Sequence, residues 1–326
     1  MSRLVSIVMA TYKPNKNFLE AQLISINNQD YPNIEVLIRD DSADSVSYQL
    51  VCSLARNLLT DKSFSIEQNE NNLGSNKTFE ILTQSVNGDY IAYCDQDDVW
   101  EENKISILVN KLESENSVLC YSDLSIIDSR GNHIANSFKD INKRLKHVYG
   151  DNLFSFFLRR NSVTGCTMLI KAEIAKKSIP FCHEFYVHDH WLALCASSQG
   201  KISYVNEPLV KYRIHENNQI GASILKDIHT KSDYVNKKLV VETRKYNYLL
   251  TYYEFVFFKR KQIEELRDWS QNRMRLFNEI SISNVFLFLK GFRIDYQLTI
   301  FEAIIKFLPE KVISLIFNRI KSTRGD

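Results

Sequence analysis

Short apolar runs alternate with amphipathic stretches along the first hundred residues of the chain. Apolar runs of strand length occupy residues 5–10, 34–39, 64–67 and 90–94, and the stretches between them, about 15–29, 46–59 and 76–86, repeat apolar residues at helical spacing. Strands that alternate with helices of this length favour right-handed crossovers and a parallel sheet with helices on both faces. The pattern therefore predicts an α/β fold.

The pattern changes character near residue 222. Strand-like runs at 118–128 and 164–170, helical stretches at 152–160 and 189–198, and an extended run at 201–214 continue the α/β pattern. After residue 222 only helical periodicity remains, which we divide into 226–265, 266–280, 283–292 and 295–321, with Pro309 interrupting the last helix. We expect two regions, an α/β domain over 1–221 and a helical region over 222–326.

Composition and cysteine spacing indicate an ordinary intracellular globular protein. The 326 residues are 44% hydrophobic and 25% charged, and the six cysteines form no CxxC pair, which favours reduced thiols. The N-terminus lacks the basic and long apolar segments of a signal peptide, and no apolar run reaches the roughly 18 residues of a spanning helix. We expect a cytoplasmic protein.

Charge and aromatic residues are distributed unevenly. Residues 1–221 carry 22 Lys and Arg against 27 Asp and Glu, whereas residues 222–326 carry 19 against 12 and hold 17 of the 38 aromatic residues. Basic, aromatic and amphipathic helices are typical of peripheral binding to an anionic bilayer. Ordinary packing onto the α/β domain is the alternative, and the two interpretations are compatible.

Three carboxylates follow the fourth predicted strand, at Asp95, Asp97 and Asp98. Like charges at the end of a buried strand repel one another unless a cation or a hydrogen-bond donor holds them. A Mg²⁺ or Mn²⁺ ion that carries a diphosphate is the simplest reason to place them there. We assign Asp97 as the direct ligand and Asp95 to the ribose or to the outer shell. A single acidic helix cap is the alternative, and it needs only one Asp.

Polar residues also end the first two strands, at Thr11 and Tyr12 and at Asp40 and Asp41. The carboxyl ends of parallel strands form one crevice, where such sheets bind ligands. Asp41 could accept the N3–H of a uracil or thymine ring with Tyr12 packing nearby, or it could close an ordinary turn.

Three further segments contain candidate site residues. Gly74 and Lys77 lie in a loop before a helix, an arrangement that suits phosphate but is also common without a ligand. Asp189 stands at a helix start, where it could take a proton from an attacking hydroxyl or cap the helix. There the helix dipole is expected to lower its pKa. His215 follows the extended run and is a candidate for a further metal or phosphate ligand. Arg213 is a candidate anion partner.

The segments taken together are more specific than any one of them. They are residues 5–12 (VSIVMATY), 35–41 (EVLIRDD), 72–74 (NLG), 88–100 (GDYIAYCDQDDVW), 188–191 (HDHW) and 212–215 (YRIH). In this order they resemble inverting family 2 glycosyltransferases of the GT-A fold, and within them the rhamnosyltransferase-like enzymes that build bacterial O-antigen and capsule. The resemblance covers about residues 3–221.

The resemblance implies a Rossmann-like nucleotide-sugar-binding domain with a helical extension. In it, Asp41 and Tyr12 match base-binding positions, Asp97 matches the metal-binding carboxylate of the DxD motif, Asp189 matches the catalytic base and His215 completes the metal or diphosphate site. Asp189 would deprotonate an acceptor hydroxyl, which displaces the nucleoside diphosphate with inversion. His188 departs from the acidic pair that often forms the base motif, and no QxxRW signature of processive synthases is present.

The resemblance also implies partners. The first donor candidate is dTDP-rhamnose and the second is a UDP-sugar. The acceptor would be a growing, lipid-linked oligosaccharide at the inner face of the bacterial plasma membrane, and no nucleic acid is expected. A sugar-1-phosphate nucleotidyltransferase is a competing hypothesis, although the loop after the first strand has no glycine. A non-catalytic glycan-binding scaffold is another, although both Asp97 and Asp189 are present.

Overall fold

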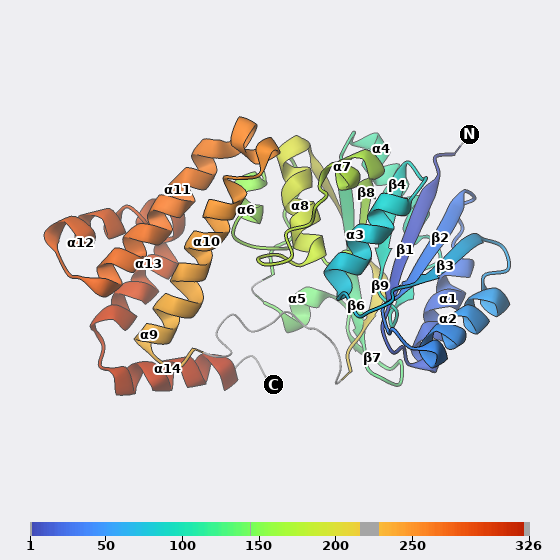
Figure 1. Cartoon of the computed structure of the whole chain (residues 1–326), viewed down its shortest axis with the longest axis horizontal. Coiled ribbons are helices and arrows are strands. Elements are labelled where there is room, and N and C mark those ends of the chain that lie inside the picture. Colours follow the sequence, from blue (N-terminus) through green and yellow to red (C-terminus); the bar gives the residue numbers. More distant parts are fainter. Residues whose placement is uncertain (1, 144, 216–227, 323–326) are drawn as a thin grey trace. The chain divides into compact units, whose positions relative to one another are not determined.

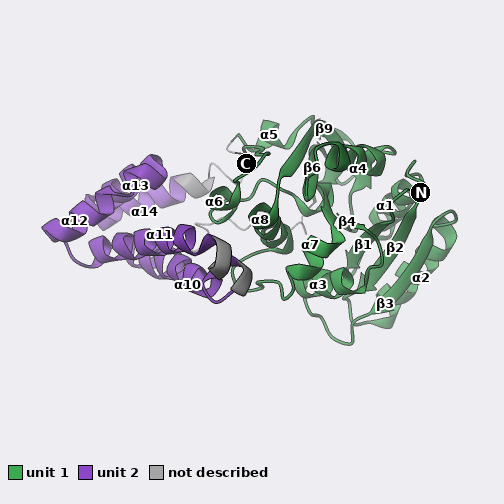
Figure 2. Cartoon of the chain, turned by 90° about the horizontal axis from the view of Figure 1, so that it is seen from above, with its two compact units in different colours: residues 1–217 green, residues 218–326 purple. Residues whose placement is uncertain are grey.

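The computed structural model describes residues 2–143, 145–215 and 228–322 (Figure 1). The chain divides into two compact units, residues 1–217 and 218–326 (Figure 2). The boundary predicted at residues 221 and 222 lies outside the described residues, as does the start of the helix predicted at 226.

The first unit is built on a mixed sheet with the strand order β3-β2-β1-β4-β8-β6-β9-β5, and β7 pairs with β6. The strands are β1 (Val5–Thr11), β2 (Ile34–Asp40), β3 (Ser63–Gln68), β4 (Tyr90–Cys94), β5 (Val99–Trp100), β6 (Leu119–Ile127), β7 (His133–Ala135), β8 (Met168–Lys171) and β9 (Ile202–Arg213). Pairings from β3 to β4 and between β6 and β9 are parallel, whereas β8, β5 and β7 run antiparallel to their neighbours. The predicted mostly parallel α/β sheet is therefore confirmed.

Helices cover both faces of this sheet. They are α1 (Lys16–Asn27), α2 (Ser45–Leu58), α3 (Ser75–Ser85), α4 (Lys104–Ser114), α5 (Phe138–Ile141), α6 (Phe154–Phe157), α7 (Ala172–Lys177) and α8 (His188–Gln199). Alternate residues of β1, such as Ile7 and Met9, share one core with Leu23 of α1 and Leu108 of α4. On β4 the ring of Tyr93 meets Phe79 of α3. Apolar side chains therefore leave the strands in both directions, as a sheet between two helix layers requires.

Two elements of the first unit differ from their predicted form. The helix predicted over 152–160 is reduced to α6, and the strand predicted over 164–170 begins as a 3₁₀ turn, η1 (Gly165–Thr167), with extended structure only from Met168. The side-chain hydroxyl of Thr167 donates to the carbonyl of Thr164, which closes the turn locally. Local hydrogen bonds of this kind compete with strand pairing.

The second unit is helical, with a different division from the predicted one. Its elements are α9 (Lys231–Tyr234), the π-helical turn η2 (Val235–Leu239), α10 (Val240–Leu249), α11 (Tyr253–Asn278), α12 (Ile282–Leu289), α13 (Phe292–Phe307) and α14 (Glu310–Ser322). The predicted break at residues 265 and 266 is wrong, because Ile263, Leu266 and Trp269 continue one buried stripe. The chain instead turns at residues 250–252, and Pro309 separates α13 from α14 as predicted.

The second unit also has a buried ionic cluster. Arg273 of α11 donates to both carboxylate oxygens of Glu302, at 3.0 and 2.8 Å from Nε, and to Glu242 at 3.0 Å, while the hydroxyl of Tyr234 donates to Glu302 at 2.6 Å. The guanidinium thus joins three helices inside the unit. Among the described residues, no helix has both the length and the apolar character needed to cross a bilayer.

Candidate active site

The carboxyl ends of β1, β2 and β4 meet at one edge of the sheet, where they are joined by hydrogen bonds. The hydroxyl of Thr11 donates to Asp40 at 2.9 Å, and the amide of Asp41 donates to the carbonyl of Thr11 at 2.7 Å. Gln96 pairs with the backbone of Tyr12 through both ends of its side-chain amide, at 2.8 and 3.2 Å. The three segments that the sequence assigns to one crevice are thus held together.

The carboxylate of Asp41 organises the loop before α3. Its Oδ1 accepts the amide of Leu73 at 2.8 Å and the side chain of Asn69 at 2.7 Å, and its Oδ2 accepts the amide of Gly74 at 2.8 Å. These donors are remote in sequence, so the side chain does not form the local turn considered above. Since Oδ2 receives one hydrogen bond and can accept two, it keeps acceptor capacity for a ligand.

The same loop connects to the start of α8. Gly74 adopts a φ of +80°, which glycine tolerates and which lets the chain enter α3. Two residues later, the side chain of Asn76 accepts the amide of His188 at 2.7 Å and donates to the carbonyl of Tyr186 at 2.8 Å. Lys77, predicted as a phosphate contact, forms an ion pair with Glu80. Asn76 therefore joins the loop that Asp41 holds to the start of α8.

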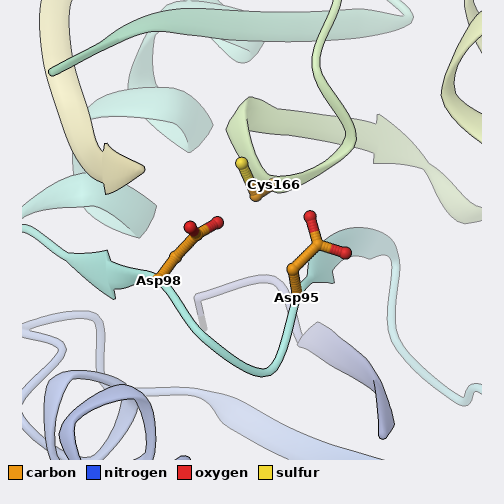
Figure 3. A group of neighbouring side chains, drawn as sticks. All are labelled: Asp95, Asp98 and Cys166. Carbon is orange, nitrogen blue, oxygen red and sulfur yellow. The ribbon is translucent and has the colours of Figure 1, made fainter. Parts of the chain in front are cut away.

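A compact acidic cluster lies between β4 and β5. The ligand atoms of Asp95, Asp98 and Cys166 all lie within 4.8 Å of one another, and Figure 3 shows both carboxylates directed toward the cysteine from the two ends of their loop. Burial, with the charges of Asp97 and Asp189, raises the pKa of Asp95 to about 7. Burial also raises the pKa of Asp98 well above its ordinary value.

These residues fit a hard divalent cation. The Oδ2 atom of Asp98 is buried and has no hydrogen-bond partner in the part of the chain that the structure describes. Clustered carboxylate oxygens are the ligands that Mg²⁺ and Mn²⁺ prefer. The thiol of Cys166 suits softer metals, and burial raises its pKa well above the ordinary value, so it remains protonated.

Asp97 and His215 are brought together although they are 118 residues apart in the chain. Nε2 of His215 lies 2.8 Å from Oδ2 of Asp97, and the imidazole packs 5.3 Å from the ring of Phe18. Arg213, predicted as an anion partner, is buried and donates from Nε to the carbonyl of Asp97 at 2.8 Å and from its amide to Asp98 at 3.1 Å. Arg213 therefore shapes the acidic loop from within.

Lys104 is a functional neighbour that the sequence reading missed. Its ammonium is fully buried, donates to the carbonyl of Cys166 at 2.6 Å and lies over the ring of Trp100. Burial lowers its pKa to about 7, and the charges of Asp98 and Asp95 are among the groups that oppose this. Lys104 is thus a buried cation close to the acidic cluster, and its hydrogen bond ties α4 to η1.

Asp189 stands in the first turn of α8, beside η1. Its carboxylate accepts the amides of Gly165, at 3.2 Å, and His190, and the side chain of Asn161 at 3.1 Å. Burial raises its pKa to about 6 although all three hydrogen bonds lower it. The lowered pKa expected from the helix dipole is therefore wrong, because desolvation outweighs the donors.

The neighbour of Asp189, His188, is held neutral. Burial lowers the pKa of its imidazole to about 3, and the ring packs 4.3 Å from Phe79. A Cβ atom on Gly165 would come within 2.6 Å of its Nε2, so only glycine fits there without displacement. Asn161 and Gly165 were also missed, because side-chain amides and glycines in loops carry no periodic signal.

Comparison with known proteins gives the family of the chain. The sequence profile of a family described as "Glycosyl transferase family 2" matches residues 6–177, more than half of the chain. The chain belongs to glycosyl transferase family 2. It is therefore a glycosyltransferase, as the resemblance predicts.

Relatives of the chain include a rhamnosyl transferase and a glucosyltransferase. The dTDP-rhamnosyl transferase RfbG of Shigella flexneri is 30% identical over 234 residues, 66% of this chain and 74% of that protein. UDP-Glc:alpha-D-GlcNAc-diphosphoundecaprenol beta-1,3-glucosyltransferase WfgD of Escherichia coli is 24% identical over 257 residues, 76% of this chain and 92% of that protein.

Solved structures share the fold at low identity. S. aureus TarS 1–349 in complex with UDP-GlcNAc has a TM-score of 0.56 and 13% identity, over 98% of this chain and 88% of that one. The mannosyltransferase PcManGT from Pyrobaculum calidifontis, in complex with GDP-Man and Mn²⁺, has a TM-score of 0.52 and 12% identity, over 98% and 87%. The glycosyltransferase fold is thus GT-A.

Proposed function

We propose that this protein is an inverting hexosyltransferase, which moves one sugar from a nucleoside diphosphate to a hydroxyl of a lipid-linked oligosaccharide. One observation carries the proposal. Asp189 is a half-buried carboxylate that is held by Gly165 and Asn161, and its charge acts on Asp95 of the acidic loop. A proton acceptor beside a diphosphate site is the arrangement that an in-line displacement at an anomeric carbon requires.

The roles of the protein groups follow from their surroundings. Asp189, with a pKa near 6, is ionised at neutral pH and accepts the proton of the attacking hydroxyl. The hydroxyl oxygen forms a bond to the anomeric carbon while the bond from that carbon to the diphosphate oxygen breaks. Because attack and departure occur on opposite sides, the configuration inverts. Fixing Asp189 through three donors keeps the base oriented.

We assign the nucleotide to the edge where β1, β2 and β4 end. The remaining acceptor capacity of Asp41 suits the N3–H of a pyrimidine, and the half-exposed ring of Tyr12 suits stacking. Thr11 and Gly74 support this edge from within, and Lys77 would have to leave Glu80 to reach a phosphate. Asp97 and His215 would hold Mg²⁺ or Mn²⁺, with Asp95 toward the ribose or in the outer shell, and the ion would neutralise charge on the departing diphosphate.

For the substrates we favour a dTDP- or UDP-sugar, with rhamnose as the first candidate. The names of RfbG and WfgD support such donors, and the name of WfgD supports a diphosphoundecaprenol-linked acceptor. We assign catalysis to residues 1–221, and packing with peripheral membrane association to 222–326. Such a protein would work at the inner face of a bacterial plasma membrane, in O-antigen or capsule synthesis.

The test is donor binding followed by sugar transfer. Purified protein is titrated calorimetrically with dTDP-rhamnose, UDP-hexoses and GDP-sugars, with and without Mn²⁺, and nucleotide release is measured with a lipid-linked acceptor. We expect one donor class to bind in a metal-dependent way. Asp97→Asn should weaken that binding, whereas Asp189→Asn should leave it intact and reduce transfer by about a hundredfold or more.

Asp61→Asn is the matched control, because it makes the same carboxylate-to-amide change in the loop before β3. It should leave binding and transfer unchanged. Binding of no donor, or binding indifferent to both Mn²⁺ and Asp97, would refute the site assignment. Full transfer by Asp189→Asn would refute the assigned base.

A further inference from the structure

Exposed apolar side chains gather on one part of the second unit. Among the described residues, 11 of the 20 exposed large hydrophobic side chains lie within residues 280–315. Eight of them lie on α12 and α13. They recur every three or four residues on α12, at Ile282, Phe286 and Leu289, and on α13 after its non-helical residue Asp295, at Tyr296, Ile300, Ile304 and Phe307, so each helix carries an apolar face. Isolated exposed hydrophobes need no explanation, but a continuous apolar face indicates an interaction surface.

The end of this surface, where α12 meets α13, combines aromatic rings with cations. We call it the aromatic–basic tip. Its members share exposure to solvent and a position within two turns of the α12–α13 connection: Phe286 (64% exposed), Leu289 (48%), Phe292 (45%) and Tyr296 (58%), with the exposed cations Lys290 and Arg293. Figure 2 shows α12 and α13 next to each other in the second unit.

The exposed charges of residues 280–307 have one sign. Within residues 280–307, the exposed charged side chains are Lys290 and Arg293. The two acidic residues of this span have internal roles, since Oδ1 of Asp295 accepts the amide of Leu298 at 3.0 Å and Glu302 is buried against Arg273. A segment whose exposed charges are all cationic and lie among apolar groups is complementary to an anionic surface.

The tip is held in shape by the helices behind it. A Cβ atom on Gly291 would come within 2.4 Å of Nε1 of Trp269 and 2.9 Å of the hydroxyl of Thr299, so the connection lies tightly against α11 and α13. Nζ of Lys290 lies 5.4 Å from the centroid of the Phe286 ring. This geometry lets an ammonium remain at headgroup level while the ring enters the apolar layer.

We propose that the aromatic–basic tip inserts into the interfacial layer of a bilayer that contains anionic lipids. This inference rests on the proposed function, because an enzyme with a lipid-linked acceptor works at a membrane surface. Aromatic rings and basic residues together are the composition of membrane interfaces. A second copy of the chain fits less well, because a two-fold contact would bring Lys290 and Arg293 of both copies onto the same patch.

The experiment is vesicle co-flotation of the full-length protein. Vesicles of phosphatidylcholine alone are compared with vesicles that contain about 30% phosphatidylglycerol, at low and high salt. We expect binding to the anionic vesicles only, weakened by salt. Each basic residue near such a surface strengthens binding about fivefold, so Lys290→Gln with Arg293→Gln should weaken it about 30-fold. Phe286→Ser with Phe292→Ser should weaken it about tenfold or more.

Matched controls change charge or apolar surface elsewhere. Arg260→Gln with Lys261→Gln removes two exposed cations from the same unit, and Val46→Ser with Ile134→Ser removes two exposed apolar side chains from the first unit. Both controls should bind like the unchanged protein. Donor binding in solution, measured for every variant, separates loss of docking from failure of the proposed function.

Three results would overturn the proposal. One is the absence of binding to anionic vesicles, and another is binding that the tip variants leave unchanged. The third is a dimer in sedimentation analysis that the tip variants dissociate, which would assign this face to a second copy of the chain.

Discussion

Replacing the proposed base Asp189 by Asn should inactivate the enzyme and stabilise its fold. Burial raises the pKa of the Asp189 carboxyl from 3.8 to about 6. Because the folded-state pKa lies above the unfolded one, the protonated form favours folding. That contribution is complete below about pH 3.8 and is lost as the pH rises through about 6. Asparagine is uncharged at every pH, so it removes the cost of burying the ionised carboxylate. Its NH₂ group donates and cannot accept, so an asparagine that keeps its oxygen toward Asn161 and His190 leaves the amide of Gly165 without an acceptor, which subtracts about one hydrogen bond from the gain.

The expected gain in the free energy of unfolding therefore depends on pH. It should be about 1 kcal/mol at pH 4.5 and about 3 kcal/mol at pH 8, relative to the unchanged protein. Because Asp189 is partly accessible to solvent, these values are upper limits. Unfolding in urea is monitored by hydrogen exchange in peptides from β1 and β4. This reports the free energy of unfolding of the first unit. Urea leaves the ionic strength low, so charges are not screened.

Asp44 provides an internal control for the direction of this pH dependence of stability. Asp44 caps α2, and hydrogen bonds from Ser47 lower the pKa of its carboxyl, so Asp44→Asn should lose stability as the pH rises above about 4. An Asp189→Asn variant that is destabilised, or whose gain is the same at pH 4.5 and pH 8, would refute the argument that this carboxylate is ionised against a burial cost.

The remaining predictions concern rates and the second unit. The turnover rate should fall about tenfold for each pH unit below about 6, as Asp189 becomes protonated, which a pH–rate profile measures. Gly165→Ala should lower turnover about tenfold or more with donor affinity unchanged, because the new Cβ meets Nε2 of His188 at 2.6 Å and Cβ of Asp189 at 3.6 Å; unchanged turnover would show that η1 is not fixed against the base. Lys104→Met should also lower turnover about tenfold, because Nζ no longer holds the carbonyl of Cys166, and equal kinetics would contradict the role given to that contact. Arg273→Met should destabilise the second unit by about 3–5 kcal/mol, because Glu302 and Glu242 lose their buried partner; Arg267→Met, next to the exposed Asp268, is the control and should change stability by less than about 1 kcal/mol.

Local periodicity predicted most elements of the first unit, because strand and helix repeats are properties of neighbouring residues. β1, β2, β4 and β9 lie within a residue or two of the predicted runs. The failures lie where hydrogen bonds or packing override local preference. Residues 164–167 close a 3₁₀ turn instead of extending β8, and α11 continues through residue 265 on a buried stripe.

The sequence by itself determined which chemistry is present and on which edge of the sheet it gathers. Thr11, Asp41 and Asp95 follow parallel strands, and the geometry of such strands brings their carboxyl ends together. The order of the motifs was enough to predict the family, because each motif is contiguous in the chain.

Only the tertiary structure decided the electrostatic state of the site and its supports. The pKa of Asp189 rises because packing removes water from a carboxylate that the helix start alone would keep acidic. Lys104, Asn161 and Gly165 act through contacts between segments that are 24 to 62 residues apart. Desolvation and long-range contacts depend on what the fold places around a residue, and no pattern of neighbours along the chain encodes them.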